Sequence, residues 1–156
     1  MYIASVCSRI NIPYLSIENI MKIDRSKSIA ELEQKHWGPP TYSSSLVRTC
    51  TALRSKPLQD FGVEDLRIMI GQENNLAFLV PIALEFLHDD ILVAGDMYNG
   101  DLLMNILRIN PNYWLQHPNE KSFLLTIIRS QWTKLLQEQH FDIELRAIQK
   151  FMRPFD

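Results

Sequence analysis

Apolar residues recur at helical spacing along most of this chain, and no stretch alternates apolar and polar residues as a half-buried β-strand does. Val63, Leu66, Met69 and Ile70, for example, fall on one face of a helix. Glycine is scarce, with five in 156 residues, which disfavours a fold of many short strands and tight turns. The sequence therefore predicts an all-α fold, a single compact domain of about six to seven helices. They are expected at residues 29–34, 45–55, 63–72, 76–87, 100–109, about 123–136 and about 143–152, with a short helical turn opened by Asn110-Pro111.

Local signals set several helix boundaries. Ser28 and Glu31 have the spacing of a capping box. Pro57 stops the second helix, and Asn99 is expected to cap the helix that begins at Gly100. Residues 88–100, which lead into that helix, are predicted to form a loop rich in acids.

The segment 76–87 is apolar almost all round, which indicates a buried element. Pro81 is expected to kink this helix or to lie in its first turn. A pair of buried strands is the competing interpretation.

The first 20 residues show no helical or alternating pattern, so residues 1–20 are predicted to be a peripheral extension and 21–156 the folded domain. No apolar run reaches the roughly 20 residues of a membrane span. The N-terminus lacks the basic start and clean apolar stretch of a secretory signal. Two cysteines fit a reducing compartment. These features together favour a cytoplasmic protein with no membrane contact.

Charge is segregated along the chain. Between Pro57 and Glu120 there are ten acids against only Arg67 and Arg108, which leaves eight excess negative charges in a chain whose overall net charge is −2. Such a block would repel a nucleic-acid backbone and attract a basic partner. Direct nucleic-acid binding is therefore not expected. The acids in this block are Asp60, Glu64, Asp65, Glu73, Glu85, Asp89, Asp90, Asp96, Asp101 and Glu120.

Residue patterns that carry catalysis are weak. The four histidines are scattered, and no serine lies in a nucleophile elbow. Apolar Ile91, Val93 and Met97 occupy positions in the acidic loop where a calcium site needs oxygen ligands. The sequence predicts no enzyme activity, no cofactor and no metal. The enzyme alternative is a metal-dependent hydrolase that uses Asp89, Asp90, Asp96 and Asp101.

Several blocks of the sequence, in one order, resemble the immunity proteins of bacterial contact-dependent growth inhibition systems. The resemblance covers about residues 21–120. The tail from Lys121 to Asp156 and the first 20 residues lie outside it, and Asn99 stands where many relatives have proline. The blocks that carry the resemblance are 28–38, 46–58, Val63-Glu64-Asp65-Leu66-Arg67-Ile68-Met69-Ile70-Gly71-Gln72, Leu79-Val80-Pro81-Ile82-Ala83-Leu84-Glu85, Gly95-Asp96-Met97-Tyr98-Asn99-Gly100-Asp101-Leu102-Leu103 and Asn112-Tyr113-Trp114-Leu115-Gln116-His117-Pro118.

The resemblance implies a cytoplasmic, non-enzymatic protein that binds the C-terminal toxin domain delivered by a sibling cell. Such toxins are often nucleases, whose clefts are basic because they hold an anionic backbone. A monomer is favoured, and the toxin is not named by the sequence. The alternative is a small helical adaptor that binds another basic protein with the same acidic face. Loop position and charge select the expected contact residues, which are Asp89, Asp90, Asp96, Tyr98, Asp101 and Glu73.

Overall fold

The computed structural model describes residues 23–36, 38–39, 44–137 and 144–153, and these residues form helices and loops. Within that part of the chain the secondary structure is helical, apart from an isolated bridge between Ser28 and Pro57. The all-α prediction is confirmed, and the predicted extension 1–20 lies outside the described residues. The elements are α2 (Ile29–Glu33), α3 (Ser45–Arg54), the 3-10 helix η1 (Leu58–Asp60), α4 (Val63–Gly71), α5 (Leu76–Asp89), α6 (Asp101–Leu107), α7 (Pro111–Gln116), α8 (Pro118–Ser130), α9 (Trp132–Gln137) and α10 (Leu145–Met152).

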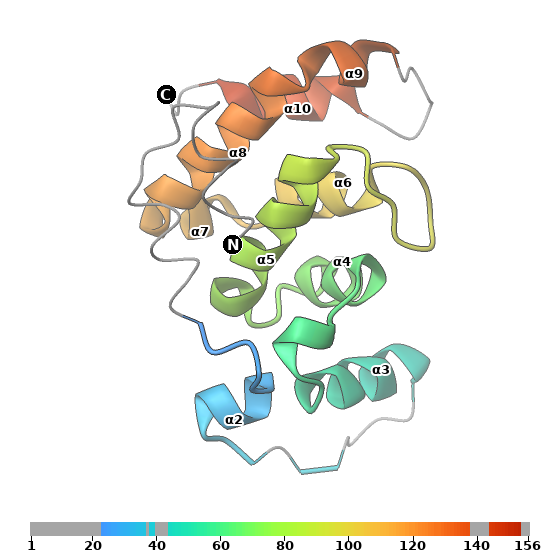
Figure 1. The fold of residues 1–156 in the computed structure, drawn as a ribbon, viewed down its shortest axis with the longest axis vertical. Coiled ribbons are helices and arrows are strands. Elements are labelled where there is room, and N and C mark those ends of the chain that lie inside the picture. Colours follow the sequence, from blue (N-terminus) through green and yellow to red (C-terminus); the bar gives the residue numbers. More distant parts are fainter. Residues whose placement is uncertain (1–22, 37, 40–43, 138–143, 154–156) are drawn as a thin grey trace.

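The centre of the molecule is formed by α4, α5 and α6 (Figure 1). Helix α4 packs against both α5 and α6, while α8 packs on the other side of α5. Helix α10 returns from the end of the chain to contact α6, and α3 lies against α4. The loop between α5 and α6 projects from one side of this arrangement (Figure 1).

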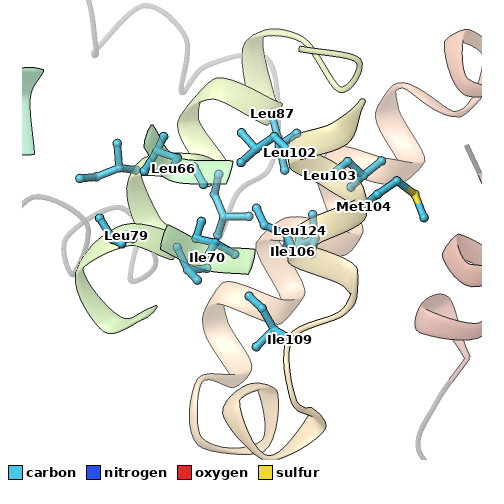
Figure 2. Packing of buried hydrophobic residues seen from close by; sticks show 14 of the residues in the cluster. Leu66, Ile70, Leu79, Leu87, Leu102, Leu103, Met104, Ile106, Ile109 and Leu124 are labelled. Atoms are coloured by element: carbon cyan, nitrogen blue, oxygen red, sulfur yellow. The ribbon is translucent and has the colours of Figure 1, made fainter. Parts of the chain in front are cut away.

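The core is built from the apolar stripes of these helices. Leu66 and Ile70 of α4 meet Leu102 and Ile106 of α6, with Leu124 of α8 behind them (Figure 2). Each of these side chains is at most 1% exposed. Because burial of a Leu or Ile side chain contributes about 1.5–3 kcal/mol, this contact region holds α4 and α6 in a fixed relation.

Helix α5 is buried on nearly every side, as its sequence indicated, and the alternative of two buried strands is wrong. Pro81 lies inside the helix rather than in its first turn. An interior proline removes one backbone hydrogen bond and costs about 3 kcal/mol. The burial of Leu79, Val80, Ile82 and Leu84 around it offsets that cost.

Several boundaries differ from the predictions. Helix α5 continues through His88 and Asp89, which were expected in the loop. Helix α6 begins after Gly100, which takes the N-cap position with φ 86°, instead of after Asn99. Glycine is suited to this left-handed conformation because it has no Cβ.

The third difference is the helix predicted at about 123–136, which is two helices, α8 and α9, separated at Gln131. This division, and the short α7, give nine α-helices within the described residues instead of six to seven. Helix α8 also starts five residues before Phe123, with Pro118 in its first turn. Proline suits that position, because the first N–H groups of a helix have no internal partner. None of the helices in the described ranges is both long and apolar enough to cross a membrane.

Candidate functional site

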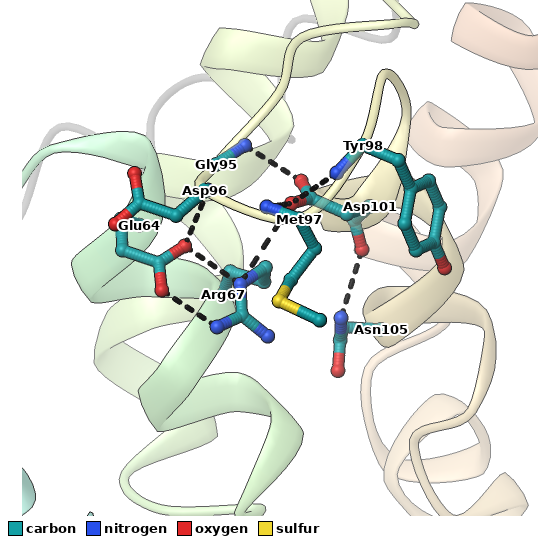
Figure 3. A network of polar contacts seen from close by, with 8 residues as sticks. All are labelled: Glu64, Arg67, Gly95, Asp96, Met97, Tyr98, Asp101 and Asn105. Atoms are coloured by element: carbon teal, nitrogen blue, oxygen red, sulfur yellow. Dashed lines mark hydrogen bonds and ion pairs between the residues drawn. The ribbon is translucent and has the colours of Figure 1, made fainter.

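The loop from Asp90 to Gly100, here called the acidic loop, is held at its base and from beneath. At the base the Gly100 N–H donates to the Leu92 carbonyl, 3.0 Å away. Beneath it the Asp101 carboxylate accepts from the Gly95 N–H at 2.7 Å, the Met97 N–H at 3.1 Å and the Tyr98 N–H at 3.4 Å (Figure 3). One side chain, at the start of α6, therefore fixes three backbone positions of the loop.

Helix α4 supplies a second support. The Glu64 carboxylate accepts the Asp96 N–H at 2.8 Å and also pairs with Arg67 through N–H donors at 2.6 and 2.7 Å. The Arg67 Nε lies 3.8 Å from Asp101 Oδ2, so one guanidinium lies between the two carboxylates (Figure 3). Bonding to Arg67 lowers the pKa of Glu64, against a smaller opposing effect of burial.

Gly95 lies where the loop passes close to the Glu64 carboxylate. A Cβ at this position would overlap the Glu64 carboxylate and would also crowd Asp101 Oδ2 at 3.1 Å. The close approach of a carboxylate to the backbone is the reason that this position favours glycine.

Of the predicted contact residues, Asp96, Tyr98 and Asp101 lie together. Asp96 is exposed and Tyr98 is half-buried. Asp101 is different, because its side chain is only 1% exposed and lies under the loop. We therefore assign Asp101 a supporting position instead of a direct contact.

Asp89 and Asp90 form a separate group at the end of α5. The Asp89 side chain is 87% exposed, with Oδ1 3.5 Å from His88 Nδ1. Asp90 accepts from Lys134 Nζ of α9 at 2.7 Å and from the Leu92 N–H at 2.8 Å. Burial alone would raise the pKa of Asp90, but Lys134 and the Leu92 N–H together bring it below its usual value.

Glu73 lies at the other end of the central helices. Its carboxylate accepts the Asn110 N–H at 2.7 Å, beyond the last residue of α6. The nine residues of α4 separate it from the Glu64 end, a length of about 13 Å at 1.5 Å per residue. Glu73 therefore lies beyond the end of α4 that is opposite Glu64, and its place in a contact surface stays a prediction.

The sequence blocks that resemble immunity proteins are the ones that build this loop and its supports. A family model described as CDI immunity proteins, where CDI is contact-dependent growth inhibition, matches residues 31–124. The chain belongs to this family. No curated protein and no solved structure matches it.

Membership in the CDI immunity proteins gives the chain a role in protection against toxins of contact-dependent growth inhibition, and such proteins are generally not enzymes. The matched residues 31–124 include α3 to α7, the acidic loop, Glu64, Arg67 and Asp101. They end inside α8, so α9 and α10 lie outside the match.

The fold changes the charge pattern seen in the sequence. Three acids of the negative block pair with bases from outside it: Asp65 with Lys56, Glu85 with Arg25 and Asp90 with Lys134. The count of acids and bases in the central block therefore overstates the negative charge that this immunity protein presents. Asp89 keeps an exposed carboxylate at the end of α5, just before the acidic loop, and Asp96 keeps one near the middle of the loop.

A feature that sequence reasoning missed is Met97. Its side chain is 66% exposed, more than any other large apolar side chain in the described ranges. The available signal was an apolar residue between Asp96 and Tyr98 in a segment with no helical pattern.

Within the described residues, no three His, Cys, Asp or Glu side chains are grouped closely enough to hold a metal ion. A part-buried acid–hydroxyl pair joins α7 to α8, where Tyr113 donates to Glu120 Oε2 at 2.6 Å. The same hydroxyl oxygen lies 3.3 Å from the Leu76 carbonyl oxygen, and the Tyr113 ring stacks on His117, with ring centroids 4.0 Å apart. Burial raises the pKa of Glu120, while its bond to Tyr113 and the nearby His117 lower it only in part.

Proposed function

We propose that this immunity protein protects the cell by binding the cognate C-terminal toxin domain directly, with the acidic loop and Asp89 as part of the contact surface. The toxin domain would be a nuclease, or another protein with a basic cleft. The observation that carries the proposal is the acidic loop itself. In a member of a toxin-immunity family, it presents exposed Asp96 from a backbone fixed by two carboxylates.

The charge of this surface suits a nuclease. A nuclease binds phosphates with lysine and arginine side chains, so its cleft is positively charged. Exposed carboxylates that face such a cleft accelerate encounter and oppose wrong partners. Asp89 precedes the loop and Asp96 lies near its middle, so both of these exposed carboxylates are available to such a cleft.

The fixed loop also supports binding. A flexible loop loses conformational freedom when it associates, and this loss opposes affinity. The acidic loop is already bonded at Gly95, Asp96, Met97 and Tyr98 in the free protein. Because little further ordering is needed, more of the contact free energy is available for binding.

The test is direct binding and protection. The toxin domain would be the C-terminal region of the large adhesin-like protein expected to be encoded beside this gene. It should co-purify with the immunity protein, and expression of the immunity protein should protect cells in which that domain is made. Failure of the two purified proteins to associate would contradict direct binding, even if cells were protected. Addition of salt should slow association, because the encounter depends on charge.

A further inference from the structure

Among the described residues, the most exposed large apolar side chain lies near the middle of the acidic loop. Four such side chains are exposed in the described residues: Leu46, Met97, Leu115 and Leu136. Three of them are on helices, Leu46 on α3, Leu115 on α7 and Leu136 on α9, where single exposed leucines are common. Among these four residues only Met97 is in a loop, and its neighbours in sequence, Asp96 and Tyr98, are charged and polar.

The backbone that carries Met97 is held by a buried charge. Met97 donates its N–H to Asp101 Oδ2, and the residues on both sides are also bonded, Asp96 to Glu64 and Tyr98 to Asp101. Figure 3 shows the Met97 side chain leaving this bonded backbone between Asp96 and Tyr98. The apolar group is thus presented from a fixed position.

Packing of the core does not explain why a carboxylate is buried at Asp101. A buried carboxylate is costly, and a well-packed apolar residue is often as stabilising or more so. Here the carboxylate is satisfied by Gly95, Met97, Tyr98 and nearby Arg67, and all of its backbone partners belong to the loop. What the buried charge secures is the conformation of the loop.

We propose that Met97 is the apolar anchor through which this immunity protein selects its toxin, and that Asp101 is the positioning residue that presents it. This inference rests on the proposed function and names what the partner must offer. The toxin domain would have an apolar pocket for the thioether, with basic side chains at the rim that face Asp96. Methionine suits such a pocket because it is unbranched and adaptable. An apolar anchor surrounded by charge is the arrangement in which a few central residues dominate affinity.

The experiment compares titrations of the purified toxin domain with wild type, Met97→Ala and Leu115→Ala. Leu115 is the matched control, because its side chain is 62% exposed and α7 follows the far end of α6 from the acidic loop. We expect Met97→Ala to weaken binding about 30-fold, as anchor residues do. Leu115→Ala should change it by less than about threefold. Met97→Leu, which remains apolar, should recover most of the affinity.

Asp101 is tested through Met97. Asp101→Asn should weaken binding in the wild-type background but add little once Met97 is alanine, because a positioning residue acts through the side chain that it positions. Hydrogen exchange of the free Asp101→Asn variant should accelerate at the Met97 and Tyr98 amides, with Leu66 and Leu102 unchanged. If Asp101→Asn does not fold, the comparison of Met97→Ala with Leu115→Ala still shows whether Met97 is the anchor.

The outcomes are distinguishable. If wild type binds the toxin domain and Met97→Ala binds equally well, the anchor is overturned while the proposed function stands. Additive losses from Met97→Ala and Asp101→Asn would overturn the positioning role. If wild type does not bind the toxin domain, the proposed function fails, and this inference fails with it.

Discussion

The side-chain oxygen of Gln131 accepts the backbone N–H of Ile91 at 2.9 Å, although forty residues separate the two in sequence. The same carboxamide donates to the carbonyls of Leu87 and His88 at 2.9 and 3.0 Å. Gln131 lies at the junction of α8 and α9, where it satisfies backbone groups at the end of α5 that have no helical partner. The interruption between α8 and α9 thus supports the point from which the acidic loop departs.

Replacing Gln131 by alanine should lower the free energy of unfolding by about 1–3 kcal/mol, because two carbonyls and one N–H would lose their partner. Chemical denaturation measures this loss. Gln137→Ala is the matched control, since Gln137 is an exposed glutamine at the end of α9. Equal midpoints for the two variants would show that the Gln131 bonds contribute nothing net.

Replacing Gly95 by alanine should destabilise the protein by about 1–3 kcal/mol, through overlap of the new methyl group with Glu64. It should also weaken toxin binding, because relief of the overlap must move the loop. Gly38→Ala is the control, as a Cβ there would have nothing within 4 Å. Thermal unfolding of both variants checks the prediction, and an unchanged Gly95→Ala would mean that Glu64 moves aside freely.

Several signals within a few residues of each other were read correctly from the sequence, although the Asn99 cap was not. The Ser28 capping box is present, with the Ser28 N–H donating to Glu31 Oε2 at 2.7 Å and the Glu31 N–H to Ser28 Oγ at 3.3 Å. The helical spacing from Val63 likewise identified α4. Caps and helix faces depend on neighbours three or four positions away, so the sequence carries them directly.

Pairings between distant segments could not be read in this way. Nothing near Gln131 in the sequence indicates that it bonds Ile91, and nothing near Asp90 indicates Lys134. Asp101, in the first turn of α6, had an adequate local explanation as a complement to the helix dipole. Its burial beneath the loop depends on how α4 meets α6, which is decided by core packing and not by local pattern.

Replacing Asp89 and Asp96 together by asparagine should weaken toxin binding by about 2 kcal/mol, if both face basic groups in the complex. Stability should change little, because both side chains are exposed and Asp96 supports the loop through its backbone. Asp90 is left intact, since its pair with Lys134 joins α5 to α9. Titration calorimetry at two salt concentrations measures the loss and its charge dependence.

The control for this double variant is Asp24→Asn, an exposed acid that precedes α2, away from the acidic loop. It should bind as wild type does. Equal losses for the two variants would point to a general charge effect, and no loss from either would place the toxin contact on another face.

Replacing Glu120 by glutamine should stabilise the protein near pH 7 relative to wild type. Burial raises the pKa of Glu120 above its usual value of 4.5, so at pH values between the two the folded state holds a proton on this carboxyl that the unfolded state has released. Wild-type stability from this group is therefore fully present below pH 4.5 and is lost as pH rises through the higher folded pKa. Glutamine cannot ionise, and its oxygen can still accept from Tyr113, so the variant should lack that loss.

Denaturation of both proteins between pH 4 and 8 gives the difference in free energy of unfolding, and the variant's advantage should grow as pH increases. A difference that does not vary with pH would mean that Glu120 ionises as easily in the folded protein as in the unfolded chain.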